Sequence, residues 1–416
     1  MADRRSVLRG LLLAAMSQHL QAAPPALQDG QSERTHWVRE GEAALMRGEP
    51  EQAMQAFERG GAMGHEPAIE LGMVRAAMQA GHYRQAMGFA AHTAGEHARD
   101  ADCVAVYIWL LRLGGQLAMA EQLMQQTLSV LNEPAARGVL EAVQAQWQRG
   151  WPQADGVLRT TPLRLAPYAH GEVLPTSARM VASACLMPAQ DGVQRVLAPA
   201  LDALKLRCEP RSACASNGAP AWWARNGLGQ TMPIALEAPS VDGLVSVWRV
   251  VGKLSPVRFQ LAARDAFAGS PAYALSYAMG RVETPAATPS ESTTAPAAWP
   301  LMRMGFAGRT DDKLGPLLGV EGLHGPWSRG DDAIHPNPMG GPVWNAQGRW
   351  IGMALAGASG QEPDRLWSQS AWRRWSRIDA SPASAGMALP TPMPVDEIYE
   401  QSLLTCLQLL TSVEPA

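Results

Sequence analysis

The stretch HPNPMGGPVWNAQGRWIGMAL, residues 335–355, decides how the second half of this 416-residue chain is expected to fold. Gly340 and Gly341 lead into a short apolar run, an Asn-Ala-Gln-Gly segment at 345–348 and a second apolar run that ends at Leu355. Apolar runs separated by a Gly/Asn turn are typical of paired β-strands. Met339 stands immediately before the two glycines. The stretch therefore predicts a glycine loop that opens a β-hairpin.

The same texture extends over residues 160–378. Short apolar runs alternate there with Gly/Pro turns, and long amphipathic stretches are few. Further strands are predicted in RMVASACLMPA (179–189), GLVSVWRVVGK (243–253), SPAYALSYAMG (270–280) and LMRMGFAGR (301–309). A Pro/Thr/Ser/Ala-rich segment, 282–300, is predicted to be a mobile loop. The pattern predicts an all-β barrel or sandwich.

Residues 35–150 differ, because they contain an internal repeat. Gly48, Gly81 and Gly115 are 33 and 34 residues apart, and two further landmarks advance by the same steps. These landmarks are Ala53, Ala86 and Ala120, and Phe57, Ala90 and Met124. Each unit is expected to be a helix, a glycine turn and a second helix, in which the small alanine allows close approach. The segment 134–150 is expected to cap the array.

These units resemble tetratricopeptide repeats, with Gly41, Gly48, Ala53 and Phe57 at that family's small and aromatic positions. The resemblance implies a concave face that captures a peptide or a protein domain. Carrying the inward positions over to this chain gives four residues from each unit, which are Val38, Glu42, Leu45 and Met46, then Leu71, Arg75, Met78 and Gln79, then Ala105, Trp109, Arg112 and Leu113. Six of them are the expected partner contacts, which are Glu42, Arg75, Met78, Gln79, Trp109 and Arg112. The arginines suit a carboxylate and Trp109 suits an interface anchor. Apolar residues at helical spacing are also typical of a core, and this alternative stays open.

The β region, residues 160–378, resembles the trypsin-like serine peptidases, which carry a His, an Asp and a Ser on two six-stranded barrels. The most specific match is PVWNAQGRWIGMAL, which follows Gly-Gly as it does after that family's nucleophile. RMVASACLMP resembles the strand-to-helix turn that ends in the catalytic His, and LVSVWRV resembles the strand that starts at the Asp. The resemblance implies a double β-barrel.

At each catalytic position the chain departs from that family. Cys185 stands in the place of the His, Leu244 in the place of the Asp and Met339 in the place of the Ser. Asp242, two residues early along the strand, is displaced by about 6–7 Å, which is beyond hydrogen-bond reach. A methionine thioether has no proton to lose and cannot be activated by a base. Cys185 is a nucleophile by type, but no histidine faces it from position 339.

The oxyanion site that the resemblance implies is also altered. One of its N–H donors belongs to a glycine two residues before the nucleophile, and that residue is Asn337 here. Pro338 follows and restricts Asn337 to extended conformations. The glycine geometry that aims the N–H at a carbonyl is therefore not expected.

Both ends of the chain carry further signals. Residues 1–23 place Arg4 and Arg5 before a short apolar run and small residues, which predicts a signal peptide of the Sec type or of a twin-arginine-like type, followed by a linker at 24–34. Residues 379–394 read as a linker and 395–412 as an amphipathic helix, either closing the second barrel or beginning a lost second domain. Cys208 and Cys214 are expected either to form a small disulfide loop or to stay unpaired.

Composition excludes several classes of function. A formal net charge of −3 gives no electrostatic case for nucleic acid. No Cys/His spacing resembles a zinc site, and no glycine loop suits a phosphate, so neither metal nor cofactor is expected. After signal cleavage no segment is apolar enough to span a bilayer.

The predicted fold is therefore multidomain α + β, with a helical hairpin array before a double barrel. The predicted function is non-catalytic binding in the bacterial periplasm. Two alternatives remain: an active serine-type endopeptidase with a different nucleophile, and a helical array that acts alone.

Overall fold

The structure is a computed structural model. Its described residues are 25–148, 174–175, 177–201, 221–277, 299–310, 317–321, 340–355, 365–377 and 391–412. The expected signal peptide, Cys208, Cys214 and most of the expected loop 282–300 lie outside these ranges.

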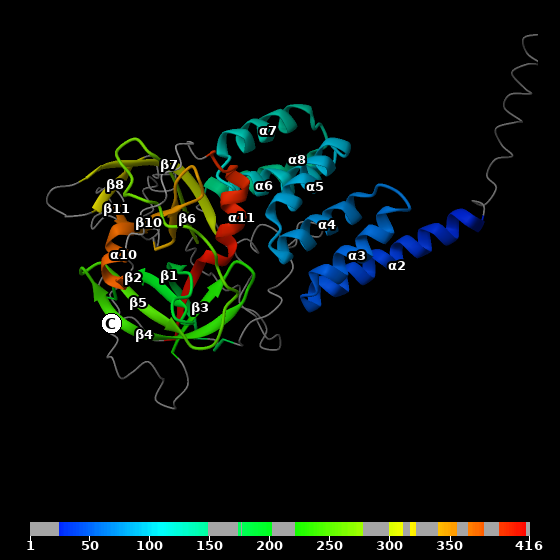
Figure 1. The fold of residues 1–416 in the computed structure, drawn as a ribbon. Coiled ribbons are helices and arrows are strands. Elements are labelled where there is room, and N and C mark those ends of the chain that lie inside the picture. The colour runs from blue at the N-terminus through cyan, green and yellow to red at the C-terminus, as the bar shows by residue number, and fades with distance from the viewer. Residues whose placement is uncertain are drawn as a thin grey trace, which may run out of the picture.

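Seven helices form the N-terminal part of the described chain (Figure 1). They are α2 (Pro25–Arg47), α3 (Pro50–Gly61), α4 (Pro67–Ala80), α5 (Tyr83–Glu96), α6 (Ala101–Leu113), α7 (Leu117–Val130) and α8 (Pro134–Gln148). Gly48, Gly81 and Gly115 sit between paired helices with φ of 73°, 84° and 75°. Glycine adopts this left-handed conformation without a steric cost, so the repeating glycine ends one helix and turns the chain into the next.

Close packing between the helices depends on small residues. Ala53, Ala86 and Ala120 are fully buried, as is Phe57 on α3. The Phe57 ring lies against the backbone of Gly41 on α2 and of Gly72 on α4, so close that a Cβ at either glycine would overlap the ring. The expected helical hairpin array is confirmed. Its first helix begins at Pro25, so residues 25–34 are helical and not a linker.

Twelve described strands follow the array, and they form two closed barrels. The first barrel contains β1 (Arg179–Leu186), β2 (Arg195–Pro199), β3 (Trp222–Asn226), β4 (Thr231–Val241), β5 (Val245–Val250) and β12 (Cys406–Thr411). The second contains β6 (Pro271–Ser276), β7 (Leu301–Thr310), β8 (Leu317–Glu321), β9 (Pro342–Trp344), β10 (Trp350–Leu355) and β11 (Arg365–Ser368). The expected all-β double barrel is confirmed.

The C-terminal segment differs from the expected helix at 395–412. Helix α11 (Val395–Thr405) ends before Cys406, and the chain continues as β12, which pairs with β1 and with β3 in the first barrel. Leu407 and Leu409 are fully buried in that barrel's core. Leu403, Leu407 and Leu410 are spaced as on a helix, but Leu407 and Leu409 flank Gln408 with the period of a strand. Pairing on both edges decides in favour of the strand.

Strand β12, the last described strand, occupies the position of a first strand in the first barrel. Around the second barrel the neighbours run β6-β7-β8-β11-β10-β9, three strands in chain order followed by three in reverse. Around the first barrel they run β12-β1-β2-β5-β4-β3. The two orders coincide when β12 is counted as the first strand. The first barrel is therefore complete only with the C-terminus of the chain.

The array and the barrels share one hydrophobic core. Helix α11 lies between the array and the barrels (Figure 1), and Tyr399 on it packs against Tyr83 at 4.3 Å between ring centroids. Trp109 on α6 meets Trp299, just before β7, edge to face at 5.6 Å. Helix α10 (Gln369–Ser376) follows β11 directly. Within the described residues, no helix is both long and apolar enough to cross a membrane.

Candidate functional site

The adjacent glycines Gly340 and Gly341 lie at the seam between the barrels. Gly340, with φ of 136°, has no room for a side chain beside the Ser183 carbonyl on β1 and Pro199 at the end of β2. Gly341 is packed equally closely against the Leu275 carbonyl on β6. The glycine pair thus lets one barrel approach the backbone of the other. Asn337, Pro338 and Met339 lie outside the described residues.

Leu244 lies immediately before β5, where the resemblance places the catalytic Asp. Its N–H donates to the Val241 carbonyl at 3.0 Å, and its own carbonyl accepts the Ala200 N–H at 2.8 Å. The neighbour of Leu244 is therefore the segment that follows β2. Asp242 is exposed in the β4–β5 turn with φ of 54°. The residue beside Ala200 is therefore a leucine, which has no carboxylate, and Asp242 lies in the exposed turn.

Cys185 does not lie on the strand-to-helix turn that the resemblance implied. It lies inside β1, paired with Leu197 on β2 and with Cys406 on β12, and it is fully buried. The chain continues through β1 to Leu186 and then returns as β2. Burial raises the pKa of the Cys185 thiol well above its usual range. The thiol stays protonated at neutral pH, so Cys185 is a poor candidate nucleophile.

Three of the six predicted partner contacts join neighbouring helices of the array. Arg75 on α4 forms an ion pair with Glu42 on α2. Gln79, one turn further along α4, donates to the Leu45 carbonyl at 3.0 Å. Arg75 and Gln79 are buried, whereas the Glu42 side chain is 38% exposed. These polar groups bind the first hairpin to the second.

The other three predicted contacts face the interior of the chain. Met78 and Trp109 are each 1% exposed, and the Trp109 ring packs on Trp299 of the barrel region. Arg112 is also buried, and burial lowers its pKa to about 10 against the opposing effect of Glu121. Met78, Trp109 and Arg112 therefore contact other parts of this chain, as expected if they belong to its core.

One cluster of possible metal ligands was missed in the sequence. His65, Glu70 and His92 place one ligand atom each within 4.8 Å of the others. They come from the α3–α4 loop, from α4 and from α5, so no local spacing connects them. The only signal is density, since four of the nine histidines of the chain fall between residues 65 and 97.

No protein-family model matches the chain, and no curated protein matches it. Among solved structures, the crystal structure of the MamO protease domain from Magnetospirillum magneticum, in its apo form, is similar at 14% sequence identity. The match covers 48% of this chain and 97% of that one, with a TM-score of 0.28. The description of the fold therefore rests on the sheet topology given above and not on this likeness.

Proposed function

We propose that this chain is a non-catalytic binding protein of the bacterial cell envelope, in which a tetratricopeptide-type array captures a protein partner and an inactive trypsin-like double barrel serves as a structural module. The observation that carries the proposal is Leu244. An isobutyl group before β5 can neither orient nor stabilise an imidazolium beside the segment after β2.

The other degenerate positions support the same conclusion. Met339 has no ionisable proton, and a buried Cys185 thiol inside a strand is not poised to attack an amide. Asn337 and Pro338 replace the flexible glycine geometry of an oxyanion loop. Losses at the base, at its orienting group and at the nucleophile together leave no group to transfer a proton.

The repeat spacing supports the tetratricopeptide assignment. The turn glycines recur after 33 and 34 residues, each at positive φ, and Phe57 fills the space between Gly41 and Gly72. Because the third hairpin packs on the barrels through Trp109, the binding surface belongs to the first hairpin. Glu42 is partly exposed there, and Met46 is 50% exposed on the same expected face.

Export to the periplasm, through a Sec or a twin-arginine-like signal at residues 1–23, completes the proposal. The basic, apolar and small segments occur in the order that signal peptides use. The partner would then be a protein or peptide of the cell envelope.

Partner capture is tested by affinity purification of the mature chain from its own cell envelope. Met46→Glu places a charge on the proposed face, and Met119→Glu is the matched control, because Met119 on α7 is 52% exposed outside the proposed face. The proposal predicts that a stoichiometric partner is lost with Met46→Glu and retained with Met119→Glu. Retention with both variants would contradict it.

A further inference from the structure

We propose that the array contains a binding site for a divalent transition-metal ion of the zinc class, formed by His65, Glu70 and His92 and oriented by His97. The site lies away from the barrels, and no part of the proposed partner capture depends on it.

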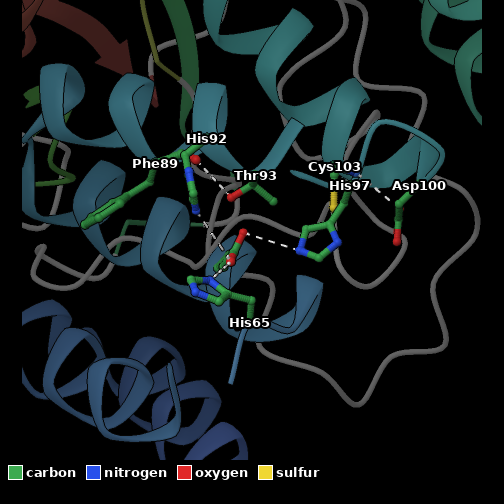
Figure 2. Close-up of polar contacts among 8 residues, drawn as sticks. His65, Phe89, His92, Thr93, His97, Asp100 and Cys103 are labelled. Carbon is green, nitrogen blue, oxygen red and sulfur yellow. Dashed lines mark hydrogen bonds and ion pairs between the residues drawn. The ribbon is translucent and has the colours of Figure 1, made fainter. Parts of the chain in front are cut away.

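The ligands converge from separate elements. Glu70 lies in the first turn of α4, His65 in the loop before that helix, and His92 in the last turns of α5. His65 Nδ1 lies 3.0 Å from Glu70 Oε1, and His92 Nε2 lies 4.0 Å from the same oxygen (Figure 2). Zinc–nitrogen and zinc–oxygen bonds of about 2.0–2.1 Å separate tetrahedral ligands by about 3.4 Å. The two separations bracket that value, so small rotations of exposed imidazoles are enough to bring both onto one ion.

The Glu70 carboxylate is buried and only partly hydrogen-bonded. Its side chain is only 9% exposed, and Oε2 has no hydrogen-bond partner. A buried carboxylate is costly unless an opposite charge or several hydrogen bonds stabilise it. Three histidines are the described groups within ion-pair distance of this carboxylate. A neutral imidazole brings no positive charge to it, and the neutral imidazole is the form that binds metals. A divalent ion on Oε1 would neutralise the carboxylate and use both imidazoles at once.

His97 approaches the carboxylate from its other side. Its Nε2 lies 3.6 Å from Glu70 Oε2, whereas His65 and His92 approach Oε1 (Figure 2). Outer groups that hydrogen-bond a metal-binding carboxylate fix its orientation, and His97 is the described histidine placed to take that role at Oε2. His97 also lines an open hollow of ≈ 440 Å³ with Pro67 and residues 96–100. The His65 and His92 side chains are 76% and 52% exposed, so solvent and ions reach the ligands directly.

The ligand set indicates the class of metal. Two imidazole nitrogens and one carboxylate oxygen suit Zn²⁺, Co²⁺, Ni²⁺ or Cu²⁺, whereas Mg²⁺ and Ca²⁺ prefer oxygen ligands alone. Three protein ligands leave a fourth position on the ion for water or for a group from another molecule. The ion would tie the loop between the first two hairpins to the end of α5.

The site is tested by titrating ZnCl₂ into the untagged, chelator-treated chain in a calorimeter, with Co²⁺ absorption reporting the coordination. We expect one equivalent to bind, and we expect His65→Gln, Glu70→Gln and His92→Gln each to weaken binding at least about 10-fold. His97→Gln is expected to weaken it by about 10–100-fold while leaving one equivalent bound.

The matched control is His82→Gln, since His82 is an exposed histidine of the same array outside the cluster. It should leave zinc affinity unchanged. His65 and His92 are 76% and 52% exposed at the side chain, so their variants should fold, which circular dichroism checks. No stoichiometric binding to the wild-type chain, or binding that survives both His65→Gln and His92→Gln, would overturn the site.

Discussion

Phe57 sets the separation of the first two hairpins, because its ring lies against the backbone of Gly41 and Gly72. Single residues of this kind determine whether neighbouring repeats can approach. Gly88 on α5 provides a contrast, since a Cβ there would have no heavy atom within 4 Å. The two helical glycines, Gly72 and Gly88, therefore separate the effect of packing from that of backbone freedom.

Replacing each of these glycines by alanine should change stability in opposite directions. Gly72→Ala forces the added methyl into the Phe57 ring and should lower the free energy of unfolding by about 1–3 kcal/mol. Gly88→Ala restricts only the unfolded chain and should raise that free energy by about 0.5–1 kcal/mol. Urea unfolding of both variants measures the difference. Equal effects would contradict the described packing of Phe57.

Cys185 makes a prediction about pH. Because burial raises its pKa, the folded thiol stays protonated at pH 8–9, the range in which an exposed cysteine titrates to the reactive thiolate. The pKa of the Cys406 thiol is also raised, mainly by burial and then by the neighbouring Cys185. Both should resist iodoacetamide at pH 8 in the native chain and react in urea, as peptide mapping would show. Rapid labelling of Cys185 in the native chain would contradict this prediction and make Cys185 a candidate nucleophile again.

The raised thiol pKa values also determine the direction in which stability changes with pH. Their contribution is fully present below the pKa of an unfolded cysteine, about 8.5, and is lost as pH rises towards the folded value. The free energy of unfolding should therefore fall above about pH 8.5, and less steeply when Cys185 and Cys406 are both replaced by alanine. Identical slopes with and without the two thiols would exclude this contribution.

Among the elements, β12 does most to complete the fold. It fills the gap between β1 and β3, and the glutamine between two core leucines shows the period of a strand. Without it, both neighbouring strands would present an unpaired edge in an open barrel.

Ending the chain after Thr405 should therefore prevent the first barrel from folding, and the product should aggregate or lose its cooperative transition. Ending it after Ser412 keeps all of β12 and should leave the thermal midpoint unchanged. Circular dichroism melts of the two truncated chains give the comparison. A native-like melt of the chain that ends at Thr405 would show that β12 is dispensable.

Elements with a strong local signal could be predicted from the sequence. The turn glycines marked the hairpins, and the apolar runs at 179–189 and 342–355 contain β1, β9 and β10. The leucine spacing predicts a helix where β12 lies, because a partner distant in sequence selects between two periods that the same leucines satisfy. The position of Cys185 inside β1 could not be predicted for a similar reason. The sequence around it is compatible with a turn or with a continuing strand, and only the pairing of β1 with β2 distinguishes the two. The sequence could indicate that Trp109 makes a contact, but not that this contact is with Trp299 of the same chain.

At the scale of the whole molecule, one hydrophobic cluster extends from the array into both barrels. Their common core includes residues of α4 to α8, of both barrels and of α11. An array held in this way cannot bend freely at its third hairpin, which is why we propose the first hairpin as the partner surface.

Unfolding should accordingly be a single transition. Far-UV circular dichroism, dominated by the helices, and near-UV circular dichroism, dominated by the buried tryptophans, should give coincident curves. Trp109→Ala should lower the free energy of unfolding by about 3–5 kcal/mol and separate the curves, because it empties the contact with Trp299. Two separate transitions in the unsubstituted chain would contradict a shared core.

The most direct test of the proposed function is catalytic activity itself. The purified mature chain should be exposed to a serine-reactive fluorophosphonate probe and assayed with labelled casein, with active trypsin as the positive control. We expect neither labelling nor turnover, and no change with Met339→Ala. Turnover that survives Met339→Ala but disappears when another serine or cysteine is replaced would contradict it and identify the chain as a peptidase.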